Sequence, residues 1–130
     1  MIPVARIAGL LIGFLLLAAG GATAHHSIAP YDLIHGTIIE GVVTRFAWEN
    51  PHGHIYLDVI GEENLIEHWT IEIDGPGALR RLGWTQNSLK PGDKITVTGA
   101  RAKNGSFNLK ALSVQFPGGR KLLVLPKPEN

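Results

Sequence analysis

The sequence contains no cysteine, carries almost balanced charge, and has neither an internal repeat nor a low-complexity stretch. The absence of cysteine excludes a disulfide scaffold, so the core alone must stabilise the fold. Twelve lysines and arginines face eleven aspartates and glutamates, which argues against a protein that grips nucleic acid through bulk positive charge. The composition also lacks the signatures of collagen, coiled coils, polytopic membrane proteins and disordered tails. With 130 residues, the chain has the size of one small domain.

Hydrophobic residues are concentrated at the N-terminus, where residues 1–24 carry a single charge, Arg6. An apolar run covers residues 7–19, and the small residues Ala22 and Ala24 match the pattern of a signal peptidase site. An uncleaved anchor is the alternative, but a membrane span needs about 20 apolar residues. We therefore expect a secretory signal peptide cleaved after Ala24, with a mature protein in the bacterial periplasm or outside the cell. Its membrane contact is then limited to the uncleaved signal during export.

The rest of the chain alternates apolar and polar residues in short segments bounded by turn residues, which is typical of a compact all-β domain. The alternation places His54, Tyr56 and Asp58 on one face of a strand and turns Trp69 of the following strand toward the core. We expect strands at residues 37–48, 54–59, 68–73, 94–98, 109–116 and 121–125, with one short helix within residues 74–83. The corresponding organisation is an N-terminal arm (25–36), a barrel domain (37–126) and a C-terminal tail (127–130).

This order of elements predicts the architecture. A long first strand with Gly41 as a bend, and a helix between the third and fourth strands, suit a small five- to six-stranded Greek-key barrel of the oligonucleotide/oligosaccharide-binding (OB) type. A β-sandwich is the alternative, but it usually needs about seven strands and rarely has a helix in the middle. In OB-type barrels the loop between the first two strands lies at the usual binding face. Here that loop is the turn Asn50-Pro51-His52-Gly53.

Histidines give the main indication of chemistry, because neutral imidazole suits copper, zinc, nickel and iron. If the mature chain begins at His25, its amine and ring chelate one metal ion, and a further histidine completes a copper site. Alternatively, the amine, the His26 amide nitrogen and the His26 ring surround Cu(II). His52 and His54 are the best additional ligands, because residues two apart in an extended segment project to one side; His68 is a weaker candidate. No closed zinc site is expected, since such sites ordinarily use cysteine.

A second reading needs no metal and leaves the histidines as ordinary turn and surface residues. In this reading the protein is an interaction or small-ligand module whose binding residues are Trp48, Asn50, Tyr56 and Trp84. These aromatic rings could stack on a sugar or a base, although Trp48 and Trp84 also flank turns and could pack a barrel end. Its partner would be an unknown periplasmic protein or small ligand, and nucleic acid is not expected, because the mature net charge is zero.

Catalysis has little support in the sequence. No nucleophile-elbow motif is present, and the carboxylate pairs Glu62/Glu63 and Glu72/Asp74 lie in a turn and at a strand end, where solvated charges are usual. Copper oxidase chemistry would need an open coordination position and a substrate surface. We therefore expect a binding protein with no catalytic residues, and with copper as its one candidate cofactor.

Several segments together resemble a family of small exported bacterial proteins known as a domain of unknown function. The segments are Ala24-His25-His26-Ser27, Trp48-Glu49-Asn50-Pro51-His52, Tyr56-Leu57-Asp58-Val59, Gly83-Trp84-Thr85 and Ser88-Leu89-Lys90-Pro91-Gly92-Asp93. The resemblance covers nearly the whole mature chain and implies export and a single small β-rich domain, without an established activity. Members often carry an aromatic residue just after the His-His-Ser segment. Ile28 stands there in this chain, so Tyr31 is the aromatic residue that could take that role.

Overall fold

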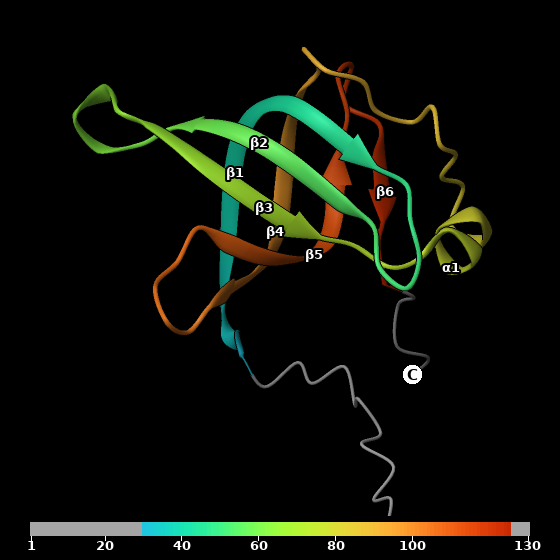
Figure 1. Ribbon diagram of the computed structural model, residues 1–130, viewed down its shortest axis with the longest axis horizontal. Helices are drawn as coiled ribbons and strands as arrows, with labels where there is room; N and C mark the ends of the chain where they lie inside the picture. Colours follow the sequence, from blue (N-terminus) through green and yellow to red (C-terminus); the bar gives the residue numbers. More distant parts are fainter. Residues whose placement is uncertain (1–29, 126–130) are drawn as a thin grey trace, which may run out of the picture.

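The computed structural model describes residues 30–125 (Figure 1). The chain order is six strands with a 3-10 turn after the second and a helix after the third. Their bounds are β1 Tyr31–Ala47, β2 His54–Ile60, η1 Glu62–Asn64, β3 Ile66–Glu72, α1 Pro76–Arg81, β4 Lys94–Ala102, β5 Asn108–Gln115 and β6 Lys121–Leu123. No helix in these residues is long and apolar enough to cross a membrane.

The strands form one sheet in the order β3-β2-β1-β4-β5-β6, and β3 also pairs with β5. This extra pairing is parallel, whereas every other pair is antiparallel. It closes the first five strands into a ring, with β6 added outside. Because β4 returns beside β1 after the β1-β2-β3 meander, the connection is a Greek key. The expected OB-type barrel is therefore confirmed, and the β-sandwich alternative is not.

The alternation of side chains along each strand explains how the interior of the ring is filled. Inward positions of each strand carry branched and aromatic residues, and successive residues point to opposite faces. The register pairs Leu57 with Trp69 across β2 and β3, and both are buried, as the sequence pattern predicts. The core is lined by Val43, Ile55, Leu57, Ile71, Ile73, Ile95, Val97, Leu109 and Val114, among others. Helix α1 lies at the end of the barrel that also holds the β1–β2 loop (Figure 1).

The first strand is long because it serves two neighbours in turn. Its C-terminal part, from Val42 to Ala47, pairs with β2, and its N-terminal part pairs with β4. The strand passes from one to the other at Gly41, where a Cβ atom would lie 2.7 Å from the Asp58 carbonyl oxygen. Glycine is needed at this bend because the two backbones approach too closely for a side chain.

The first strand begins earlier than the sequence pattern predicts, within the residues expected to form an arm. Strand β1 begins at Tyr31, which pairs with Ala102, and the register then shifts so that Gly36 pairs with Ala100. The residues between them bulge outward around Asp32, whose carboxylate accepts hydrogen bonds from the backbone N–H groups of Ile34 and His35. Such a bulge breaks the alternation on which the sequence reading depends.

Candidate functional site

The β1–β2 loop, residues 48–53, is held against the end of β3. The Ile73 N–H donates to the Gly53 carbonyl at 3.0 Å, and the Gly53 N–H donates to the Asp74 carbonyl at 3.3 Å. A Cβ atom on Gly53 would lie 2.8 Å from the Ala47 carbonyl oxygen, so the loop packs too tightly there for a side chain. The Asn50–Pro51 peptide bond is cis. The loop therefore presents His52 toward the closing seam of the barrel.

His52 contacts a group of polar side chains at that seam, here called the Glu72 cluster, with members Tyr31, His52, Glu72, Asp74 and Lys110. His52 Nδ1 lies 2.8 Å from Glu72 Oε1. Lys110 Nζ donates to the same oxygen at 2.8 Å and lies 3.7 Å from Asp74 Oδ1. The Tyr31 hydroxyl donates to Glu72 Oε2 at 2.9 Å. One carboxylate thus joins the start of β1, the β1–β2 loop, β3 and β5.

The parallel pairing of β3 and β5 creates this arrangement. Glu72 and Lys110 are register partners, so their side chains leave the sheet side by side. The side chain of Lys110 is only 8% exposed and that of Glu72 is 22% exposed. A nearly buried ammonium group must be paired, and two carboxylates meet that requirement here.

The cluster shifts the pKa values of Glu72 and Tyr31. Burial would raise the pKa of Glu72, but hydrogen bonds from Lys110 and Tyr31 outweigh it and lower that pKa below its ordinary value. Burial, together with the hydrogen bond to Glu72, raises the pKa of Tyr31 to about 12. At neutral pH the cluster therefore combines a carboxylate with a neutral phenol that donates to it.

The two candidate loop histidines engage different carboxylates. His52 turns to Glu72, whereas His54 Nδ1 lies 3.4 Å from Glu49 Oε1. His68, the weaker candidate, lies 2.7 Å from Asp58 Oδ1 farther along the same outer face. Across residues 30–125 no three histidine, cysteine or carboxylate side chains gather in a way that could hold a metal ion. His25 and His26 lie outside the described residues, so the metal site as a whole stays a prediction.

The residues of the metal-free reading have different surroundings. Trp48 is half-buried against Phe46, with the Arg80 guanidinium 5.5 Å from its ring centroid. Its Nε1 is buried and has no hydrogen-bond partner in the described part of the chain. Tyr56 lies on the outer face of β2, where the Arg45 guanidinium covers its ring at 4.4 Å, and Asn50 is exposed in the loop.

Trp84 requires a correction. It is 1% exposed and packs in the core against Phe46 and Phe116, and its Nε1 donates to the Leu123 carbonyl at 2.8 Å. Its ring therefore has no surface to offer a ligand. The barrel end is closed by this side chain, which is the structural role that its position beside a turn also allowed.

Sequence reasoning missed most of the Glu72 cluster. Glu72 and Asp74 were expected to be solvated at a strand end, and Tyr31 was assigned to an arm. The one available signal was Lys110, a charged residue inside the apolar strand segment Leu109–Phe116. A buried lysine needs an acid, but the sequence does not say which one.

Fold and site together define a small OB-type barrel with a polar cluster beside its first inter-strand loop. The chain belongs to a family of unknown function (DUF6152), whose model matches residues 13–110. The resemblance noted in the sequence is thereby confirmed. No curated protein is similar in sequence to this chain.

Proposed function

We propose that this protein is an exported binding protein that holds a transition metal ion, copper in the first instance, between its N-terminal histidines and His52. The observation that carries the proposal is that Glu72 links Tyr31 to His52. The Tyr31 hydroxyl contacts one oxygen of the Glu72 carboxylate, and His52 Nδ1 contacts the other. Tyr31 is the first residue of β1. The N-terminal segment therefore joins the barrel at the cluster that contains the best loop ligand.

Chain length allows the two parts to meet. His25 precedes Tyr31 by six residues, and an extended segment of that length spans at most about 20 Å. The barrel supplies His52 but no complete ligand set within residues 30–125. A site at this position needs further ligands, and the amine and ring of His25, with His26, have the required chemistry if the signal is cleaved after Ala24.

The Glu72 cluster also suits a metal ligand electrostatically. Histidines that bind metals commonly donate one ring N–H to a carboxylate, which orients the ring and increases its basicity. Glu72 offers that partner to His52 Nδ1, so His52 would present Nε2 to the ion. His54 has a similar partner in Glu49, although at 3.4 Å. Nitrogen ligands favour copper among the divalent first-row metals.

The second candidate is the metal-free ligand surface. It is favoured by the Arg45–Tyr56 stack beside the β1–β2 loop, because this outer face is where OB-type barrels usually bind. Trp48, Asn50 and Tyr56 remain its residues. This reading predicts that Trp48→Ala weakens ligand binding, whereas histidine substitutions do not.

A Cu(II) titration, followed by calorimetry and spectroscopy, tests the first proposal. N-terminal sequencing of the exported protein should first give His25. We expect one Cu(II) to bind tightly to the protein that starts at His25, and to bind at least tenfold more weakly when a single glycine precedes His25. His52→Asn should have a similar effect. His68→Asn is the matched control, because His68 also pairs with a carboxylate but lies outside the cluster, and it should leave binding unchanged. Equal, weak binding in all four proteins would refute the metal site and favour the ligand surface.

A further inference from the structure

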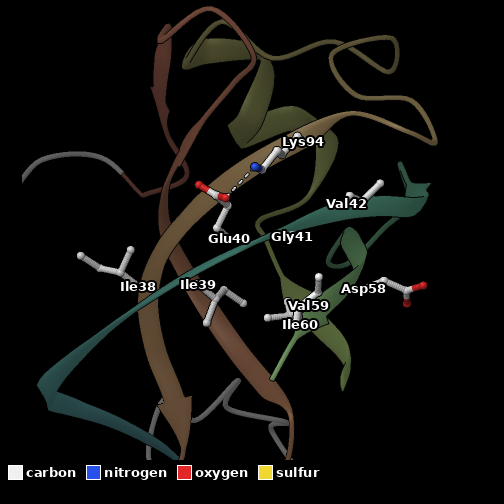
Figure 2. Close-up of a pocket in the computed structure, with 9 residues that line it drawn as sticks. All are labelled: Ile38, Ile39, Glu40, Gly41, Val42, Asp58, Val59, Ile60 and Lys94. Atoms are coloured by element: carbon white, nitrogen blue, oxygen red, sulfur yellow. Dashed lines mark ion pairs between the residues drawn. The ribbon is translucent and has the colours of Figure 1, made fainter. Parts of the chain in front are cut away.

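A shallow groove lies between the middle of β1 and the C-terminal end of β2 (Figure 2). Its volume is about 440 Å³, comparable with small-ligand pockets of roughly 300–1,000 Å³. It opens where β1 leaves β2 to follow β4. The residues that line it are Ile38, Ile39, Glu40, Gly41, Val42, Asp58, Val59, Ile60 and Lys94.

Both walls of this groove are strand edges without a strand partner in the described residues. Pairing of β1 with β2 begins at Val42 and Asp58, so Ile38 and Glu40 have only β4 beside them, on their other edge. The Val43 N–H donates to the Asp93 carbonyl on the β4 side. Backbone N–H and carbonyl groups of successive residues point to opposite edges of a strand. Those of Glu40 and Ile38 therefore point away from β4 and into the groove.

Apolar side chains line part of the groove, and one of them, Ile60, is the register partner of Ile66 at the tip of the β2–β3 hairpin. The side chains of Ile38 and Ile60 are 70% and 74% exposed, and Leu65 and Ile66 at the tip are exposed as well. Exposed apolar side chains beside an unpaired strand edge are characteristic of an interaction site. An extended segment can satisfy both features, since its backbone pairs with the edge and its side chains cover the apolar surface.

Charge indicates which segment fits. Residues 38–42, 58–67 and 94 contain five carboxylates but only one amine, that of Lys94. Lys94 is paired with Glu40 at 2.9 Å (Figure 2). Residues 25–130 are neutral as a whole, so the residues around this groove are distinctly acidic. A second copy would bring two acidic ends together, whereas a basic segment would complement them.

From these observations we infer that the β1–β2 groove binds an extended protein segment in which apolar residues alternate with lysine or arginine, added as a strand along residues 38–40 of β1. This docking site lies at the opposite end of β2 from His52. It does not depend on the proposed metal function.

The test uses the mature protein and two short acetylated and amidated peptides, Lys-Val-Lys-Val-Lys and Glu-Val-Glu-Val-Glu. Amide chemical shifts measured by NMR locate the binding surface, and titration at low and high salt measures its charge dependence. We expect the basic peptide to bind at least tenfold more tightly than the acidic one, with shifts confined to residues 36–42 and 58–66. Its affinity should fall as salt is raised. A basic peptide with proline at the central position should lose binding, because proline lacks the backbone donor.

Matched variants complete the experiment. Val42 in the groove and Leu112 on β5 are both 42% exposed. Val42→Lys should reduce binding of the basic peptide at least tenfold, and Leu112→Lys should not change it. Ile60→Lys, at a more exposed position, repeats the test if Val42→Lys does not fold. Equal affinity for the two peptides, shifts outside the groove, or concentration-dependent self-association through these residues would each overturn the inference.

Discussion

Lys110 Nζ lies 2.8 Å from Glu72 Oε1, and the two residues are register partners in the only parallel pairing among the described strands. The ion pair therefore marks the seam at which β3 and β5 close the barrel. Because Tyr31 and His52 bind the same carboxylate, the closure of the fold and the candidate site share one residue. Changes at Glu72 should affect both.

Replacing Glu72 by glutamine should destabilise the fold by about 2–3 kcal/mol at pH 7, because it leaves Lys110 with only the more distant Asp74. The pKa of Glu72 is lower in the folded protein than its ordinary value of 4.5. The ionised carboxylate therefore stabilises the folded state at pH values above about 4.5, and this stabilisation is lost as the pH falls through the pKa of the folded protein. When unfolding by urea is measured from pH 7 to pH 3, the free energy of unfolding should decrease less with falling pH in the variant than in the parent protein. Glu62→Gln, at an exposed carboxylate, is the control and should behave like the parent protein.

The Tyr31 hydroxyl should matter at the opposite end of the pH range. The pKa of this hydroxyl is raised from 10.0 to about 12. Its contribution to the stability of the folded state is therefore complete below pH 10 and is lost between about pH 10 and 12. Tyr31→Phe should cost about 1 kcal/mol at pH 8, the usual value for one hydrogen bond. Unfolding measured from pH 8 to pH 11.5 should show the two proteins converging. A constant difference across that range would contradict the assignment.

The two tryptophans of the metal-free reading should respond differently to loss of the indole N–H. Trp84→Phe removes the hydrogen bond to Leu123 and leaves space in the core, so we expect a loss of about 2–3 kcal/mol. Trp48→Phe removes a buried donor that has no partner in the described residues, and should be neutral or slightly stabilising. Urea denaturation of both variants measures the difference. Equal losses would show that Trp48 has an acceptor after all.

Gly41 should not tolerate a side chain. Gly41→Ala places a Cβ atom 2.7 Å from the Asp58 carbonyl oxygen and 2.9 Å from Val59 Cγ2, and we expect a loss of about 1–3 kcal/mol from the backbone shift. Gly77→Ala is the matched control, because nothing lies within 4 Å of its Cβ position in α1. It should be neutral or stabilise the protein by up to about 1 kcal/mol. Thermal unfolding of the two variants gives the comparison.

Binding without catalysis is the remaining prediction. Copper-loaded protein starting at His25, supplied with a reductant, should consume oxygen no faster than the form extended by one glycine with the same total copper. The physical reason is that a small barrel with its loop packed against β3 offers little substrate surface beside the site. Oxygen consumption that requires the free His25 amine would instead indicate an oxidative enzyme.

Local sequence patterns determined much of the barrel wall. The alternation in residues 54–59 and 68–73 predicted the β2–β3 hairpin and its inward residues, and turn residues marked the helix and most strand ends. These features depend on neighbours within a few residues. The start of β1 was missed because the bulge around Asp32 interrupts the period, and β4 runs to Ala102, beyond its apparent pattern.

The site required the tertiary structure. The sequence supplied His52 and its loop as a candidate, from residue chemistry and the usual binding position of the fold. It contained no sign that Glu72 would accept hydrogen bonds from Tyr31 and Lys110, which lie 41 and 38 positions away in the sequence. Periodicity specifies which face of a strand a side chain occupies, whereas closure of the ring specifies which strands stand beside each other and in what register. The Glu72 cluster and the β1–β2 groove both result from that second, non-local choice.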